Sequence, residues 1–214
     1  IEECKEEDEV IFYFSGHGDL EEKVLNQMGY LLCHDSPSFA YMAGGTVRVG
    51  DLQGIVNTLT QINKTKVLLI TDACRAGQLV GNSINGTGAT TANLQQFSNA
   101  VKILSCQPNE YSLEGEQWGG GRGVFSYHLI DGLYGLADRD KNYQVKLKEI
   151  DRYLEDRVPV ETDPQPQNPI VLGDKETLLA LVDPPTLATM EEQKKGELPI
   201  FSTIDGKGIL EEEL

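Results

Sequence analysis

The sequence has few cysteines and no long apolar run. Its four cysteines lie far apart among 214 residues and form no Cys-x-x-Cys pair, so the sequence indicates neither a zinc ribbon nor a disulfide scaffold. No apolar run approaches the ~18–20 residues that cross a bilayer. No leader of the signal-peptide type precedes the first apolar segment. These absences predict a soluble, cytoplasmic protein that has no membrane partner.

Basic residues are also scarce. Lys and Arg number 18 against 34 Asp and Glu, which gives a net charge of −16. A surface with this excess of negative charge repels a phosphate backbone. Nucleic-acid binding is therefore excluded as the main activity.

The apolar residues that are present fall into short runs with a helical segment between them. Residues 10–14 and 67–70 are continuous apolar runs, and residues 51–62 repeat at helical spacing, with Asp51 as the expected N-cap. A strand, a crossover helix and a second apolar strand are typical of a parallel sheet that is buried on both faces. Residues 101–105 are a third core strand by the same criterion.

The second half of the sequence predicts two more helices and two strands. Residues 124–136 are predicted to form a helix whose core-facing residues are Phe125, Leu129, Ile130 and Leu133. A second helix is predicted over residues 147–158 and ends at Pro159. Residues 170–172 and 178–182 are the last predicted strands. We assign residues 1–183 to one domain and residues 184–214 to an acidic tail or the start of a neighbouring segment.

His17 and Cys74 each follow one of the apolar strands directly. Functional groups gather at the carboxyl ends of parallel strands, so we expect these two residues at the same edge of the sheet. An imidazole beside a thiol can take its proton, and the backbone amides of Gly18 and Cys74 could form an oxyanion hole. Either residue alone is more typical of a structural role. That structural interpretation is kept for Cys4, Cys33, Cys106, His34 and His128.

The sequence Ser-Gly-His-Gly at residues 15–18 and Asp-Ala-Cys-Arg-Ala-Gly at 72–77 resemble the His and Cys motifs of caspase-like peptidases. Bacterial caspase homologues and metacaspases are closer than animal caspases, and the resemblance extends through residues 107–114 and 123–127. It implies an α/β fold, a caspase-like three-layer sandwich with a mainly parallel central sheet. It also implies a Cys–His dyad endopeptidase with Cys74 as nucleophile, His17 as general base, and the amides of Gly18 and Cys74 around the oxyanion.

Asp72 bears on specificity within this resemblance. Animal caspases cut after aspartate and carry Gln two positions before the nucleophile, whereas Asp72 stands there in this chain, as in metacaspases and paracaspases. A carboxylate in the S1 pocket favours a cation, so we expect cleavage after Arg or Lys. A turn cap is the alternative role for Asp72. Glu114 is a second candidate S1 acid, and a solvated loop charge is its alternative.

Two other functions remain open. A catalytically silent caspase-like domain could act as a scaffold or adaptor, although the presence of both His17 and Cys74 favours an enzyme. A cysteine hydrolase with a non-peptide substrate would share the same dyad, and peptide turnover separates it from a peptidase.

The resemblance also bears on regulation and completeness. Residues 76–101 contain no Lys or Arg, so an enzyme specific for basic residues would leave this linker intact. Caspase-like domains begin with further strands before the one that carries the histidine. We therefore expect a preceding segment or companion chain beside residues 10–14, which would otherwise be an exposed apolar edge.

Residues 138–149 resemble a calcium-binding EF-hand loop. Asp138, Asp140, Asn142 and Glu149 stand at ligand positions, but Tyr143 replaces the glycine of the sharp turn. No cofactor is required by the predicted chemistry, and calcium is a possible ligand of this loop. The alternative is a turn rich in Asp and Asn that caps the following helix.

Overall fold

The computed structural model describes residues 3–20, 29–37, 40–73, 100–107 and 110–195. The strands are β1 (Glu9–Leu20), β2 (Gly29–Leu32), β3 (Thr46–Arg48), β4 (Lys66–Ala73), β5 (Val101–Leu104), β6 (Glu114–Gly115), β7 (Arg122–Gly123), β8 (Gln144–Lys146), β9 (Ile170–Leu172) and β10 (Leu178–Leu181). The helices are α1 (Val49–Asn57), α3 (Val124–Asp131), α4 (Leu147–Thr162) and α5 (Pro184–Lys194), and π-helical turns extend α1 over Thr58–Ile62 and α3 over Gly132–Leu136. Within these ranges, no helix is long and apolar enough to cross a membrane.

Six strands form the central sheet in the order β3-β2-β1-β4-β5-β9. The long pairings, β1 with β4 and β4 with β5, are parallel, whereas β9 runs antiparallel to β5. The short strands β2 and β3 extend the sheet antiparallel beyond the end of β1. The α/β class with a mainly parallel central sheet is therefore confirmed.

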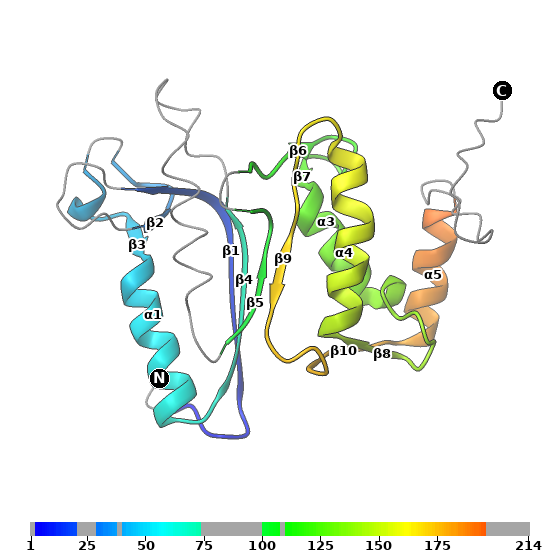
Figure 1. Cartoon of the computed structure of the whole chain (residues 1–214), viewed down its shortest axis with the longest axis horizontal. Helices are drawn as coiled ribbons and strands as arrows, with labels where there is room; N and C mark the ends of the chain where they lie inside the picture. The colour runs from blue at the N-terminus through cyan, green and yellow to red at the C-terminus, as the bar shows by residue number, and fades with distance from the viewer. Residues whose placement is uncertain (1–2, 21–28, 38–39, 74–99, 108–109, 196–214) are drawn as a thin grey trace.

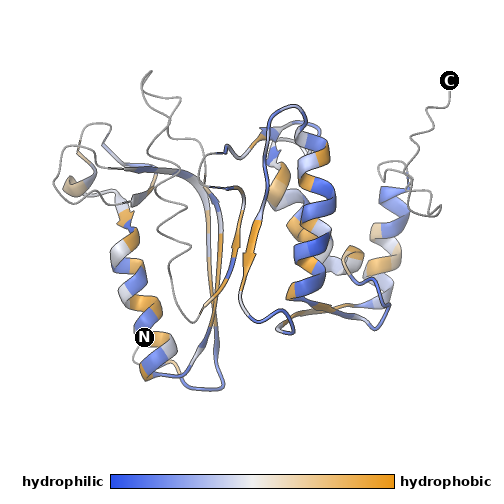
Figure 2. Cartoon of the chain, in the orientation of Figure 1, coloured by the Kyte–Doolittle hydropathy of each residue, from blue (hydrophilic) through white to orange (hydrophobic). Residues whose placement is uncertain are grey.

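Helices cover both faces of this sheet, with α1 on one side and α3 and α4 on the other (Figure 1). Strand β4 shows why, because its alternate residues belong to different cores. Val67 and Leu69 pack in the cluster that contains α1, whereas Leu68 and Ile70 pack in the cluster that contains α3 and α4. A strand buried on both faces needs a continuous apolar run, and the hydropathy colouring shows such a run on β9 (Figure 2).

Within the described residues, strand β1 packs mainly on one face. Phe12 and Phe14 pack against the α1 cluster, whereas Ile11 is 60% exposed and Tyr13 is 55% exposed on the other face. Among the described strands, only β4 pairs with residues Glu9 to Gly16 of β1. The edge of these residues that faces away from β4 therefore has no described neighbour. The preceding segment or companion chain expected at this edge stays a prediction.

Several helix boundaries differ from the expected ones. Arg48 is the N-cap of α1, so Asp51 lies in the first turn, where its charge faces the positive end of the helix dipole. Helix α4 continues through Pro159 to Thr162, whose buried hydroxyl donates to the Val158 carbonyl and supports the last turn. Ile130, expected inward, is 37% exposed because it lies about 100° around the helix from each of its buried neighbours, Leu129 and Asp131.

Helix α5 has no apolar periodicity in its sequence, and local capping chemistry explains its start. The Asp183 carboxylate accepts a hydrogen bond from the Thr186 amide, and Pro184 stands at the first helical position. At its other end, Lys194 is buried and its Nζ lies 2.8 Å from Oδ2 of Asp131 on α3. The ion pair holds α5 against the domain.

Candidate active site

His17 lies where β1 changes its neighbour. Residues up to Gly16 pair in parallel with β4, and Gly16 is the register partner of Ala73, whereas His17 pairs with Leu32 of the antiparallel strand β2. The imidazole is half-buried. Its Nδ1 is buried and has no hydrogen-bond partner among the residues that the structure describes. A buried ring nitrogen without a partner is costly, so this atom is suited to contact a reacting group.

Cys74 lies outside the described residues. The described part of β4 ends at Ala73, the residue that precedes Cys74 in the sequence and pairs with Gly16. Gly18 is buried and pairs with Leu31 of β2. The roles of Cys74 as nucleophile and of the two amides as oxyanion donors stay predictions.

Asp72 is a buried carboxylate, 7% exposed, near the end of β4. The Ser112 hydroxyl donates to its Oδ1 at 2.5 Å, and the Ser126 hydroxyl donates to its Oδ2 at 2.5 Å. Both serines are distant in sequence, so the carboxylate binds side chains of other segments. No Lys or Arg in the described ranges makes an ion pair with it.

A chain of donors reaches Asp72 from each side. Ser112 gives its one hydroxyl proton to Asp72 and accepts a hydrogen bond from Gln167 Nε2 at 3.1 Å. Ser126 also gives its proton to Asp72, so the Tyr13 hydroxyl, at 3.1 Å, must donate to Ser126. Each donor polarises the next one, which makes both serine hydroxyls better donors, and each carboxylate oxygen keeps a lone pair for another donor.

A small cavity of about 110 Å³ lies beside His17 and Asp72. Its lining comes from β1, from β4, and from the β6–β7 hairpin with the two residues before it: Ser15, Gly16, His17, Asp72, Ser112, Leu113, Glu114 and Gly123. The structure thus brings His17, Asp72 and Glu114 to one cavity. Of the two acidic residues that line this cavity, Asp72 is buried and Glu114 is exposed.

The sequence did not single out four residues that line this cavity or hold Asp72 in it. Ser112 and Ser126 stand inside the two motif segments 107–114 and 123–127, so their position in those motifs was the available signal. Gly123 is the N-cap of α3, and a side chain in its place would collide with the Asp72 carboxylate. Gln167 is fully buried and accepts a hydrogen bond from the Leu113 amide at 2.8 Å, although its proline-rich segment indicates only an exposed loop.

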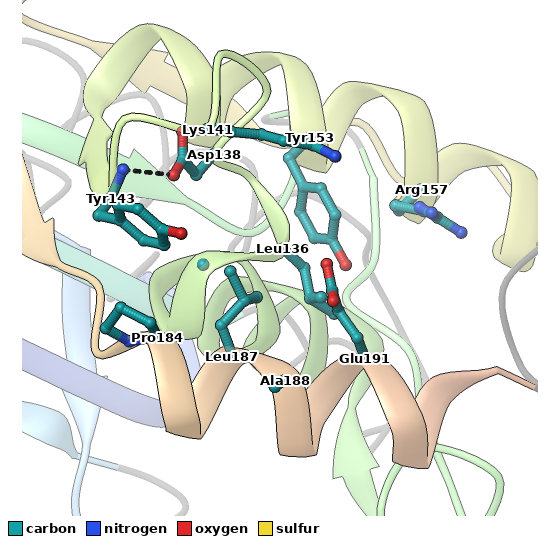
Figure 3. A pocket seen from close by; sticks show the side chains of 11 residues that line it. Leu136, Asp138, Lys141, Tyr143, Tyr153, Arg157, Pro184, Leu187, Ala188 and Glu191 are labelled. Atoms are coloured by element: carbon teal, nitrogen blue, oxygen red, sulfur yellow. Dashed lines mark hydrogen bonds between the residues drawn. The ribbon is translucent and has the colours of Figure 1, made fainter.

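The candidate calcium loop lies beside a second cavity of about 420 Å³ (Figure 3). One carboxylate oxygen each of Asp138, Asp140 and Glu149 lies within 4.8 Å of the others, which fits oxygen ligands for a hard cation. The same side chains also accept backbone amides, as Asp138 does from Tyr143 at 2.7 Å and Glu149 does from Lys146 at 2.9 Å. Tyr143 has a φ of 61°, in the left-handed region that the motif usually gives to glycine. Calcium binding here stays a prediction.

The other cysteines and histidines do not line the cavity beside His17. Cys4 is half-buried and Cys33 is exposed, both as free thiols. Cys106 and His128 are buried, and His34 is exposed.

Comparison with known proteins agrees with the sequence motifs. The caspase-domain family model (Peptidase C14) matches residues 2–176. A search of curated proteins finds no match. Among solved structures, the crystal structure of protein GSU0716 from Geobacter sulfurreducens is similar, with 14% sequence identity and a TM-score of 0.48 over 87% of this chain and 71% of that chain. The family match shows that the chain belongs to the caspase-domain family of cysteine peptidases.

Proposed function

We propose that this chain is a cysteine endopeptidase that cleaves proteins after Arg or Lys. One observation carries the specificity: the buried Asp72 carboxylate lines the cavity beside His17 and has two serine donors but no cationic partner in the described ranges. Family membership supports the reaction class.

In the proposed reaction, the Cys74 sulfur attacks the scissile carbonyl carbon while His17 accepts the thiol proton. The developing oxyanion binds the amides of Gly18 and Cys74. His17 then donates the proton to the leaving amine as the C–N bond breaks, and a thioester to Cys74 remains. Water, deprotonated by His17, hydrolyses the thioester and restores the thiol. The half-buried imidazole supports this role for His17, because its Nδ1 has no partner in the part of the chain that the structure describes.

Charge decides the preference for a basic residue. Burying a carboxylate without an opposite charge costs several kcal/mol, and a guanidinium or ammonium group that enters the cavity offsets this cost. An acidic substrate side chain would instead meet a second negative charge at close range. Glu114 lines the same cavity from its exposed side, and we propose that it adds to the preference for a cation.

A panel of fluorogenic peptides that differ only in the P1 residue tests the function. We expect turnover with P1 Arg or Lys and none with P1 Asp, and loss of turnover in Cys74→Ala and in His17→Ala. An electrophilic peptide with P1 Arg should label the parent protein and fail to label Cys74→Ala. Faster turnover with P1 Asp than with P1 Arg would refute the specificity, and turnover that persists in both variants would refute the mechanism.

A further inference from the structure

The β6–β7 hairpin contributes to the wall of the Asp72 cavity and is held from outside the cavity. Glu114 begins the hairpin and Gly123 ends it, and both line the cavity. Between them, the Trp118 side chain is 5% exposed and belongs to the core cluster of α3 and α4. The hairpin lies beside the C-terminal end of α4 (Figure 1).

One carboxylate at that end of α4 binds the hairpin. The Trp118 indole donates from Nε1 to Oε2 of Glu161 at 2.6 Å. The Nε1–H group is the only polar group of the indole ring, and a buried indole needs a hydrogen-bond acceptor for it. The Glu161 side chain is 31% exposed, so the contact lies at the rim of the core.

The other oxygen of the same carboxylate faces α3. His128 on α3 is buried, and its Nε2 lies 2.9 Å from Oε1 of Glu161. Partial burial raises the pKa of Glu161, but the interactions with His128 and Trp118 outweigh it and hold the pKa below its ordinary value. Since α3 also carries Ser126, Glu161 connects the two segments that enclose the Asp72 carboxylate.

We propose that Glu161 is a positioning residue of the substrate cavity, which fixes the β6–β7 hairpin and α3 against each other so that Asp72 faces a basic side chain. This inference rests on the proposed function. Glu161 does not line the cavity and acts through Trp118 and His128.

The close approach of Gly123 to Asp72 explains how such a contact reaches the substrate. A side-chain carbon on Gly123 would lie 2.4 Å from Oδ2 of Asp72, so the carboxylate occupies the space that the glycine leaves free. A shift of the hairpin therefore moves the carboxylate or opens a gap beside it. Either change weakens the binding of the P1 cation more than the chemistry at Cys74.

Trp118 is the only tryptophan of the chain, so its fluorescence reports on the hairpin directly. The experiment compares the parent with Glu161→Ala, which removes the acceptor, and with Glu161→Gln, which keeps an acceptor oxygen without the charge. Glu155→Gln is the matched control, since Glu155 is an exposed acid on the same helix. Each variant is assayed for tryptophan emission, for cleavage of a fluorogenic peptide with P1 Arg, and for binding of benzamidine, an aromatic amidinium.

In Glu161→Ala we expect red-shifted emission, KM and the benzamidine Kd raised about tenfold, and kcat within about twofold of the parent. Glu161→Gln should recover most of the affinity, and Glu155→Gln should match the parent. If emission shifts while KM and Kd stay unchanged, or if kcat alone falls, the positioning role is overturned although the peptidase function stands. A parent that neither cleaves the peptide nor binds benzamidine overturns the proposed function and this inference together.

Discussion

The Asp72 carboxylate occupies the space that a side chain at Gly123 would need. A side-chain carbon at position 123 would lie 2.4 Å from Oδ2 of Asp72, a separation that carbon and oxygen atoms do not tolerate. Gly123 has a φ of −66°, which any residue can adopt. The glycine is therefore required for the space that it leaves free and not for its backbone conformation.

Gly123→Ala should displace Asp72 without straining the backbone. We expect kcat/KM for a P1 Arg peptide to fall at least about tenfold, mainly through KM, because the S1 carboxylate moves. Gly54→Ala is the control, since Gly54 lies in α1 with nothing within 4 Å of the added carbon. Steady-state kinetics on both variants check the prediction, and parent-like cleavage by Gly123→Ala would contradict it.

Asp72→Asn removes the charge of the cavity while keeping its shape. Loss of one partner of a desolvated ion pair costs ~2–5 kcal/mol, so we expect turnover of P1 Arg and P1 Lys peptides to fall by about a hundredfold or more. Peptides with an uncharged P1 residue should change little. The ratio between the two peptide classes is the measurement, and an unchanged ratio would exclude Asp72 as the specificity residue.

The linker after the catalytic motif should stay uncut in the active protein. Residues 76–101 contain no Lys or Arg, so an enzyme specific for basic residues has no site there. Mass spectrometry of active protein under denaturing conditions should find every peptide bond of residues 78–99 intact. A break within those residues in active protein would disprove the prediction.

Calcium binding by residues 138–149 is measured by isothermal titration. Binding predicts heat in the parent and a weaker signal in Asp140→Asn, because Asp140 is the exposed member of the carboxylate cluster. Asp156→Asn, a change of an exposed acid on α4, is the control. An absence of heat in the parent, together with unchanged peptidase activity in a chelator, would refute calcium binding by this loop.

Acid should weaken the contact between Trp118 and α4. The pKa of Glu161 is lower in the folded protein than its ordinary value of 4.5, so the group stabilises the fold fully above pH 4.5 and loses this contribution as the pH falls through the folded pKa. His128, Trp118 and Arg157 are the groups that act on it. Urea unfolding followed by tryptophan fluorescence should show the parent more stable than Glu161→Gln at pH 6. The difference should shrink below pH 4.5, and a difference independent of pH would contradict the assignment.

Most of the central architecture could be predicted from the sequence because it depends on apolar runs. The run of residues 67–70 is uninterrupted, and a strand of that kind is stable only between two apolar layers. Helix α5 is the counterexample. Its sequence has no apolar stripe, and its start depends on the Asp183 cap and on Pro184, which are local signals that a search for periodicity does not register.

By itself, the sequence determined the class of the sheet, the family motifs around His17 and Cys74, and Asp72 as the acid of interest. Local order and hydrophobic pattern are properties of neighbouring residues, so the sequence displays them. Only the tertiary structure decided that Asp72 receives donors from Ser112 and Ser126, and that Glu161 joins the hairpin to α3. These contacts join segments dozens of residues apart, and their geometry exists only once both cores have packed around the sheet.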